Sequence, residues 1–260
     1  MAIRLQRAGL RVVITELPQP LVVRRYVSFA EAVYRGEFQV EEVTAILATE
    51  LSRALEITER GSVAVLVDPD LTVLFQLPSF LPADEPYVLI DARMNKRPPE
   101  ISIESAPLVI GLGPGFVAGG NCHAVVETNR GHWLGRVYWE GSAQADTGVP
   151  EAVAEFGAER VLRSPADGCL VTHAQIGDRL EPGQCVAEVE GQLIRAPFKG
   201  VLRGLLHPGI RVHRGMKVGD VDPRDDPRYC FQVSDKSLAI GGGVLEAILS
   251  RPDLRPHLWD

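Results

Sequence analysis

The chain has 260 residues, of which 45% are hydrophobic and 23% charged, and a formal net charge of −7. This length is typical of two domains, each with its own core, and the composition is that of an ordinary globular protein. The acidic balance and the lack of a dense basic stripe argue against a nucleic-acid-binding surface. No apolar run approaches the roughly 18 to 20 residues of a membrane span, and we expect no signal peptide. The four cysteines lack CxxC spacing, which favours a reducing cytoplasm over a disulfide framework.

The N-terminal segment predicts a helix followed by a strand. Residues 3–8 have helical periodicity and end at Gly9, and residues 11–17 (RVVITEL) form a β-branched run that contains Glu16. A helix, a glycine and a strand that ends in an acid make the second half of a Rossmann unit, where the acid often binds a ribose hydroxyl. The first strand and its Gly-rich phosphate turn would lie upstream of Met1. Glu16 is then either a ligand of a nucleotide or a plain acid at the end of a strand.

Strands and helices alternate through the rest of the first hundred residues. We expect helices over residues 29–35 and 49–60, and strands over 40–43, 62–67 and 87–92. The alternation predicts a Rossmann-like parallel α/β domain over residues 1–104, whose ligands bind beyond the carboxyl ends of the strands. This places four charged residues on one rim: Glu16, Asp68, Asp91 and Arg93. Arg93, Lys96 and Arg97 together could meet a phosphate, although such a group is also typical of a solvated loop.

Residues 105–160 contain a glycine-rich loop and a predicted β-hairpin. A buried strand that begins near residue 107 leads into Gly111, Gly113 and Gly115, whose backbone N–H groups could approach an anion closely. Pro114 interrupts the loop and no helix is expected after it, so the dinucleotide-binding fingerprint is not met. The hairpin is expected over residues 124–128 and 133–139.

The same segment holds three side chains of types that can bind a metal. Cys122, His123 and His132 do not have the spacing of a four-ligand zinc site, so no metal is predicted. We also find no convincing Ser–His or Cys–His pair, and we assign no catalytic residue.

Residues 163–221 consist of two similar copies of one sequence pattern. Corresponding residues are 32 positions apart, with no gaps. Arg163 and Pro165 of the first copy, for example, recur as Arg195 and Pro197. A fixed-period repeat predicts architecture directly, and here each copy predicts short strands separated by tight glycine turns. Neither copy can bury its apolar face alone, so the two copies must interlock. We assign this duplicated domain to residues 161–223.

The duplicated domain resembles the barrel-sandwich hybrid of biotinyl and lipoyl carrier domains. In those domains the turn between the two halves presents the lysine that carries the cofactor. Here that turn, residues 188–193 (EVEGQL), has no lysine, and the nearest one, Lys199, lies in the following turn. We therefore expect neither biotin nor lipoate, and we expect a rigid, unmodified module that docks against a partner.

The C-terminal tail, residues 224–260, contains Asp235 and Lys236, which are further candidates for binding a ligand, followed by three consecutive glycines at 241–243. These glycines are expected to begin a helix that runs to residue 249. They could seat an anion on the helix N-terminus. They could equally allow close packing between the helix and a sheet.

Taken together, several phrases resemble the accessory-protein family of selenium-dependent molybdenum hydroxylase systems. These phrases are LPQPLVVRRYVSFAEAVYRGE (17–37), PLVIGLGPGFVAGGNCHAVVETNRGHWLGRV (107–137), the unmodified sandwich, and VSDKSLAIGGGVLEAIL (233–249). The resemblance covers nearly the whole chain. It implies a role in maturing or supporting a molybdenum hydroxylase of the xanthine dehydrogenase type. Family members usually begin with a strand and a Gly-rich loop of the form GGGDLATG, which this chain lacks.

Two functions remain open at this stage. The first is a maturation factor that binds the apo-hydroxylase, other maturation proteins, or a molybdopterin-type or nucleotide ligand without turnover. The second is an enzyme that modifies the molybdenum cofactor or a nucleotide at the α/β rim and the loop at 111–115. A homo-oligomer is compatible with both, and neither predicts a nucleic-acid or membrane partner.

Overall fold

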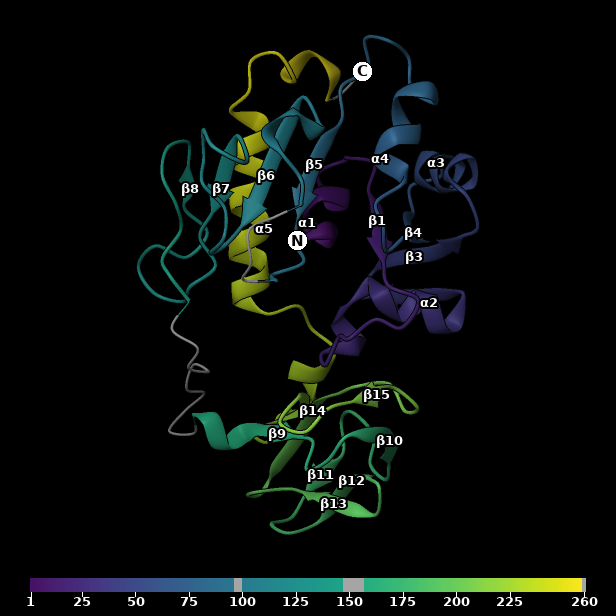
Figure 1. Ribbon diagram of the computed structural model, residues 1–260, viewed down its shortest axis with the longest axis vertical. Helices are drawn as coiled ribbons and strands as arrows, with labels where there is room; N and C mark the ends of the chain where they lie inside the picture. The colour runs from purple at the N-terminus through teal and green to yellow at the C-terminus, as the bar shows by residue number, and fades with distance from the viewer. Residues whose placement is uncertain (96–99, 147–156, 259–260) are drawn as a thin grey trace.

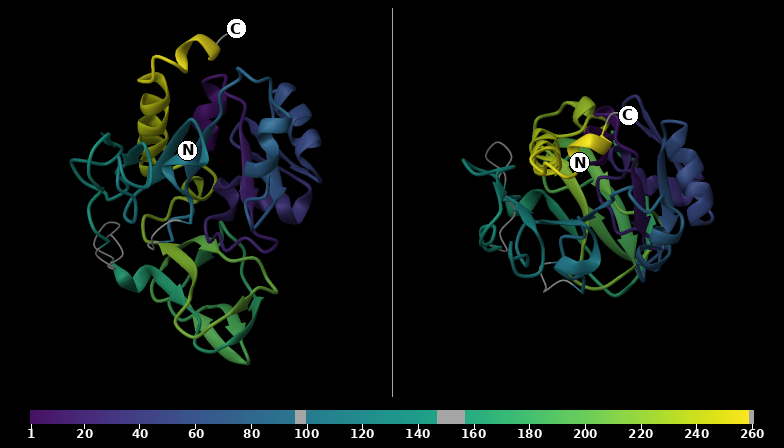
Figure 2. Two further views of the ribbon diagram at one scale, coloured as in Figure 1. Left: turned by 45° about the horizontal axis from the view of Figure 1, so that its top comes forward. Right: turned by 90° about the horizontal axis from the view of Figure 1, so that it is seen from above.

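The computed structural model describes residues 1–95, 100–146 and 157–258, and its class is mixed α/β (Figure 1). Its strands form four sheets of four strands each. Two sheets and the helices make an α/β body, and the other two make a separate lobe at one end of the molecule, as Figures 1 and 2 show. None of the helices in the described ranges is both long and apolar enough to cross a bilayer.

The first sheet has the strand order β1 (Val13–Glu16), β4 (Val63–Val67), β3 (Val43–Ala48) and β2 (Glu37–Val40). The first three strands are parallel, and β2 pairs antiparallel with β3 through a two-residue turn at Glu41 and Glu42. The strand predicted over 40–43 was therefore wrong, because a hairpin turn occupies its centre. The helices are α1 (Ala2–Arg7), α2 (Ala32–Arg35), α3 (Leu51–Glu59) and the short α4 (Val73–Gln76).

The second sheet has the order β5 (Val88–Asp91), β6 (Leu108–Leu112), β7 (Ala124–Val126) and β8 (Val137–Tyr138). Strands β5, β6 and β7 are parallel, and β8 pairs antiparallel with β7, which confirms the predicted hairpin. The single parallel sheet expected over residues 1–104 is thus wrong in one respect. The parallel strands fall into two sheets, and the second includes strands from beyond residue 104.

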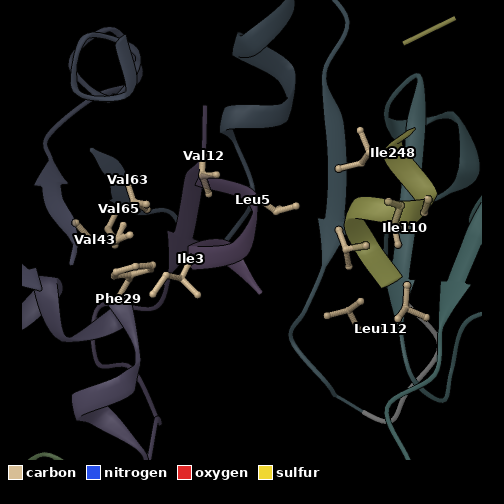
Figure 3. Close-up of a cluster of buried hydrophobic side chains, with 14 of the residues drawn as sticks. Ile3, Leu5, Val12, Phe29, Val43, Val63, Val65, Ile110, Leu112 and Ile248 are labelled. Atoms are coloured by element: carbon tan, nitrogen blue, oxygen red, sulfur yellow. The ribbon is translucent and has the colours of Figure 1, made fainter. Parts of the chain in front are cut away.

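One hydrophobic core joins the two sheets. Figure 3 shows Ile3, Leu5 and Val12, from α1 and the start of β1, between side chains of the first sheet and Ile110, Leu112 and Ile248 on the other side. Residue 248 belongs to α5 (Asp235–Leu249), the longest helix. The segments expected separately at 1–104, 105–160 and 224–260 therefore all contribute to one core, because α5 buries its apolar side against the second sheet.

The strands β1 and β5 are edge strands of their two sheets. Arg11, just before β1, forms an ion pair with Glu85, just before β5, so the amino ends of these strands lie close together. All four residues of β1, and three of the four in β5, are only partly buried, in contrast to the fully buried β6. Figure 1 places α1 between the two edges.

The lobe is built from the duplicated residues. One sheet has the order β13 (Gln192–Arg195), β12 (Cys185–Val189), β10 (Gly168–Thr172) and β15 (Arg211–Val212). The other has β11 (Arg179–Leu180), β14 (Gly200–Leu205), β16 (Lys217–Asp222) and β9 (Val161–Arg163). Each sheet takes two strands from each copy. The two copies therefore interlock, as the repeat predicts.

The offset of 32 also holds for individual hydrogen bonds. Gly183 N donates to Ala196 O at 2.8 Å, and Gly215 N donates to Ser164 O at 2.8 Å, which is the same bond with the copies exchanged. Arg195 Nη1 donates to Gly183 O, and Arg163 Nη1 to Gly215 O, both at 2.8 Å. The lobe consequently has an internal pseudo-twofold axis that relates one copy to the other.

The second copy carries the contact with the α/β body. Leu205 N donates to Val23 O at 2.9 Å, and Arg25 Nε donates to Leu205 O at 2.8 Å. A Cβ atom on Gly204 would lie 2.7 Å from Val23 Cγ1, so glycine is needed for this approach. The first copy has Thr172 at the corresponding position, and the repeat is broken where the body docks.

Candidate functional site

The predicted rim residues divide into two pairs on two sheets. Glu16 ends β1 and Asp68 follows β4, and Asp68 N donates to Glu16 O at 3.0 Å. Asp91 ends β5 in the second sheet, and Arg93 follows it. Each pair lies at the carboxyl ends of parallel strands, as expected. The prediction of a single rim on one sheet was wrong, because the strands that carry these pairs are not neighbours.

Asp68 organises the turn into α4. Its Oδ1 accepts hydrogen bonds from Thr72 N at 3.0 Å and from Thr72 Oγ1 at 2.9 Å, and its Oδ2 accepts one from Val73 N at 2.9 Å. This is how a carboxylate satisfies the free N–H groups at the start of a helical turn. Both oxygens of Asp68 already have protein donors, so its role is structural.

Asp91 and Arg93 are similarly engaged with each other. Asp91 is buried, and Arg93 Nη2 donates to its Oδ2 at 2.6 Å and Arg93 Nε to its Oδ1 at 3.1 Å. Arg93 Nη1 also contacts Glu100 at 3.1 Å, and these carboxylates raise the pKa of Arg93 above its ordinary value. An arginine held by two acids is a weak candidate for a phosphate. Lys96 and Arg97, the other members of the predicted group, lie outside the described residues.

The glycine loop is filled by its own side chains. A Cβ on Gly111 would lie 2.1 Å from Phe116 Cγ, and one on Gly113 would lie 2.4 Å from Thr128 Oγ1. The carbonyl of Gly115 accepts a hydrogen bond from Asn121 Nδ2 at 3.2 Å. The glycines therefore provide room for Phe116 and Thr128 to pack, and the loop is not an open cradle for an anion.

The third predicted group lies at the start of α5. Ser234 caps this helix by accepting a hydrogen bond from Ser237 N, and Asp235 and Lys236 form its first turn. Arg130 donates two hydrogen bonds to Asp235, at 2.5 and 2.8 Å, and lowers the pKa of that carboxyl well below its usual range. The glycines at 241–243 lie inside α5 rather than at its start. The anion seat proposed for them was wrong, and the alternative of close packing is confirmed.

Of the acidic residues predicted for the site, Glu16 has the carboxylate that makes the fewest hydrogen bonds to other protein groups. It is partly buried, and within the described part of the chain its carboxylate accepts one hydrogen bond, from Leu17 N to Oε2 at 3.1 Å. Burial raises the pKa of Glu16, because the charged form loses hydration that the single backbone donor does not replace. A carboxyl group in this state can both hold a proton and accept a hydrogen bond from a ligand hydroxyl.

Two side chains that the sequence did not single out, Tyr34 and His207, stack on each other at the contact between the lobe and the α/β body. Burial and the charges of Glu31 and Glu16 raise the pKa of Tyr34, and Arg25 partly offsets this effect. The phenol of Tyr34 donates to Pro20 O at 3.3 Å. Its ring stacks on His207 with the ring centroids 3.8 Å apart and the planes 7° from parallel. His207 comes from the duplicated lobe, so this site lies where the lobe meets the α/β body.

A cluster of ion pairs around the buried Glu31 lies at the same contact between the lobe and the α/β body. Glu31 is 2% exposed, and its Oε1 accepts from Arg25 Nη1 at 2.9 Å and from Arg35 Nε at 3.0 Å. Its Oε2 is buried without a hydrogen-bond partner among the described atoms. The signal for His207 was available in the sequence, since the first copy has Gln175 at the matching position.

Exposed apolar side chains surround the carboxyl ends of β1 and β4. Leu17 and Val67 are exposed at the strand ends, and Phe75 on α4 is 85% exposed. Apolar surface next to a proton-holding carboxyl group suits a ligand with a flat or apolar portion and a hydroxyl or amine.

The described residues contain no group of three or more His, Cys, Asp or Glu side chains placed to hold a metal.

Replacement of Glu16 by glutamine is expected to increase stability at neutral pH. A carboxyl group whose folded pKa is raised contributes stability that is fully present below its unfolded pKa, about 4.3, and is lost as the pH rises through the folded pKa. The melting temperature of Glu16→Gln should therefore exceed that of the parent at pH 7.5, by a margin that shrinks toward pH 4.5. Glu59→Gln, at an exposed position, is the control, and equal pH profiles for both variants would contradict the burial of Glu16.

Comparison with known proteins gives one strong sequence match. The chain is 45% identical over 249 residues to "Uncharacterized protein YqeB" of Escherichia coli (strain K12). The match covers 96% of this chain and 45% of the relative, so the chain spans less than half of that protein's length. Among models of known protein families, none matches.

Solved structures give only partial likenesses. An aspartoacylase family protein from Mesorhizobium loti is 18% identical, with a TM-score of 0.24, over 31% of this chain and 25% of that one. The apo form of the ectoine utilization protein EutE (DoeB) from Ruegeria pomeroyi is 22% identical, with a TM-score of 0.23, over 32% of this chain and 28% of that one. At such low TM-scores neither likeness bears on the overall fold or on function.

Proposed function

We propose that the chain is an accessory protein for the maturation or support of a selenium-dependent molybdenum hydroxylase, and that it binds its ligand without turning it over. The observation that carries this proposal is the joint occurrence of the sequence phrases at 17–37, 107–137 and 233–249 in one chain. The engagement of Asp68, Asp91 and Arg93 in internal hydrogen bonds supports binding over catalysis. All four cysteines are free, which is typical of the reducing cytoplasm where we place this activity.

The test is copurification with a molybdenum hydroxylase of the xanthine dehydrogenase type. The tagged chain is expected to retain the hydroxylase expressed without molybdenum, and to retain less of the metal-loaded enzyme. Omission of the tagged chain from the same lysate gives the background. Equal recovery with and without the tagged chain would remove the basis for an accessory role.

The second candidate is an enzyme that modifies the molybdenum cofactor or a nucleotide at the α/β rim. Glu16 favours this alternative, because burial raises its pKa and its carboxylate accepts one backbone hydrogen bond in the described part of the chain. We would incubate the chain with ATP, GTP or CTP and measure the products by chromatography, with Glu16→Gln as the test variant. Turnover that Glu16→Gln abolishes would favour the enzyme. Gly113→Val is unsuitable for this purpose, because Gly113 has a φ of +75° and no room for a Cβ.

We further propose that the two body sheets belong to one Rossmann-like sheet, completed by a parallel strand from polypeptide outside this chain. The edge strands β1 and β5, with their amino ends joined by Arg11 and Glu85, support this proposal. The relative is more than twice as long as this chain, so it has further polypeptide that could supply a strand. Amide exchange in β1 and β5 is expected to slow in a longer polypeptide, while exchange in β4 and β6 stays the same. Unchanged exchange in β1 and β5 would count against a bridging strand.

The lobe supports the proposal of a barrel-sandwich hybrid without a carrier arm. Its strands are exchanged between two sheets, and its central turn is a tight one at Glu190 and Gly191, both with positive φ. Lys199 is not in that turn, and its Nζ lies 3.7 Å from Glu181 Oε1.

A further inference from the structure

A groove of about 240 Å³ opens on the lobe between the edge strands β9 and β13. Its lining consists largely of pairs related by the offset of 32: Leu162 with Ile194, Arg163 with Arg195, and Pro165 with Pro197. The groove therefore lies on the pseudo-twofold axis of the lobe. Leu162 and Ile194 are buried, so the floor is apolar, and the two arginines are exposed on it.

The two arginines are held in equivalent positions. Arg163 donates through Nη1 to Gly215 O, and Arg195 donates through Nη1 to Gly183 O, both at 2.8 Å. One guanidinium nitrogen of each side chain is thus fixed to the backbone, and the remaining donors stay available for a carboxylate. The pseudo-twofold axis places one such cation on each half of the groove. Glu159 is the one acidic residue in the lining.

The backbone of the two edge strands adds a second kind of binding group. In an antiparallel pair, every second residue directs its N–H and C=O to the partner strand. Ser164 N bonds to Met216 O, and Ala196 N bonds to Gln184 O, both at 2.9 Å. The N–H and C=O groups of Arg163 and Arg195, one residue earlier, consequently point away from the sheets. An open strand edge of this kind is a template for a further strand.

We propose that this groove binds an extended, acidic peptide segment of a partner protein, which adds as a strand along β13 or β9. The peptide backbone pairs with the open edge, apolar side chains cover Leu162 and Ile194, and carboxylates meet Arg163 and Arg195. A small dicarboxylate would use the arginines alone and leave the edge unused. The proposal goes beyond the maturation role and does not depend on which protein supplies the peptide.

The test uses the full chain and a fluorescein-labelled peptide, Val-Glu-Val-Glu-Val-Glu, which places its acids on one face of a strand. Fluorescence anisotropy should report binding at low salt that weakens as salt is added. Arg163→Glu and Arg195→Glu should each weaken binding about tenfold, by charge reversal next to the bound carboxylate. The matched control is Arg179→Glu with Arg211→Glu, an exposed pair related by the same offset but outside the groove. These control variants should bind as the parent does.

Two further measurements keep the outcome decisive if a charge reversal impairs folding. Arg163→Gln and Arg195→Gln keep the length of the side chain without the charge, and should weaken binding in the same direction. The same peptide with every second amide N-methylated keeps all its charges but loses the donors needed for pairing, and should bind poorly. Equal affinity for the N-methylated peptide, displacement by glutarate as effective as by unlabelled peptide, or unchanged binding to both Arg→Gln variants would overturn the proposal.

Discussion

Gly243→Ala is expected to lower the free energy of unfolding of the α/β body by about 2 to 3 kcal/mol, the upper part of the usual range for overpacking a core. A Cβ at this position would lie 2.2 Å from Gly135 O and 2.8 Å from Val126 Cγ1. Both atoms belong to the sheet side of the contact, and a backbone oxygen cannot rotate away as a side chain can. The approach is mutual, because a Cβ on Gly135 would lie 2.7 Å from Ala239 O in α5.

The neighbouring glycine provides the control for this prediction. Gly242 also lies inside α5, but a Cβ there would meet only Arg4 Nη1, at 2.9 Å, the mobile end of a long side chain. Gly242→Ala should therefore stabilise the protein by up to about 1 kcal/mol through helix propensity. Urea denaturation followed by circular dichroism at 222 nm measures both. If Gly243→Ala gains stability as Gly242→Ala does, helix and sheet do not make this close contact.

These two glycines show what the sequence could and could not predict. Three consecutive glycines are unfavourable in a helix, so the sequence placed them at a helix start, where an anion could bind. The helix instead begins at Asp235 with Ser234 as its cap, and Gly243 within it is required by the tertiary contact with Gly135. Tertiary packing overrode local propensity here, and nothing within the segment itself signals its distant partner.

The repeat gave a more complete prediction, because it encodes pairing between distant segments directly. An offset without gaps forces corresponding strands into equivalent positions, and the strands exchange between the two sheets as expected.

The sequence was less informative for the candidate site. Glu16 was found because it ends a strand, but Tyr34 and His207 meet only when the lobe docks on the body. His207 departs from the repeat, which is the one signal that could have revealed it.

Asp220→Ala is expected to destabilise the lobe by about 3 to 5 kcal/mol, the cost of removing one partner from a buried ion pair. Asp220 is 2% exposed, and its two carboxylate oxygens pair with Arg160 and Arg203. Arg203 also donates to Asp222 at 2.8 Å, and Arg24 lies nearby with its pKa lowered to about 10 by burial and by the charge of Arg203. Without Asp220, Arg203 would keep only one of its two acidic partners, Asp222.

The first copy of the repeat offers a matched control for this loss. Glu188 is the residue that the offset of 32 relates to Asp220, and it lies on the exposed face of the lobe beside His173, at 3.2 Å. Glu188→Ala should cost less than about 1 kcal/mol, because a polar contact that is open to solvent contributes little. Thermal unfolding of both variants at pH 7.5 compares the two faces directly. The difference arises because Asp220 is buried among arginines, whereas Glu188 is partly exposed, so the same strand position is a buried charge in one copy and a more solvated one in the other. Similar losses for both variants would mean that docking does not bury the face of the second copy.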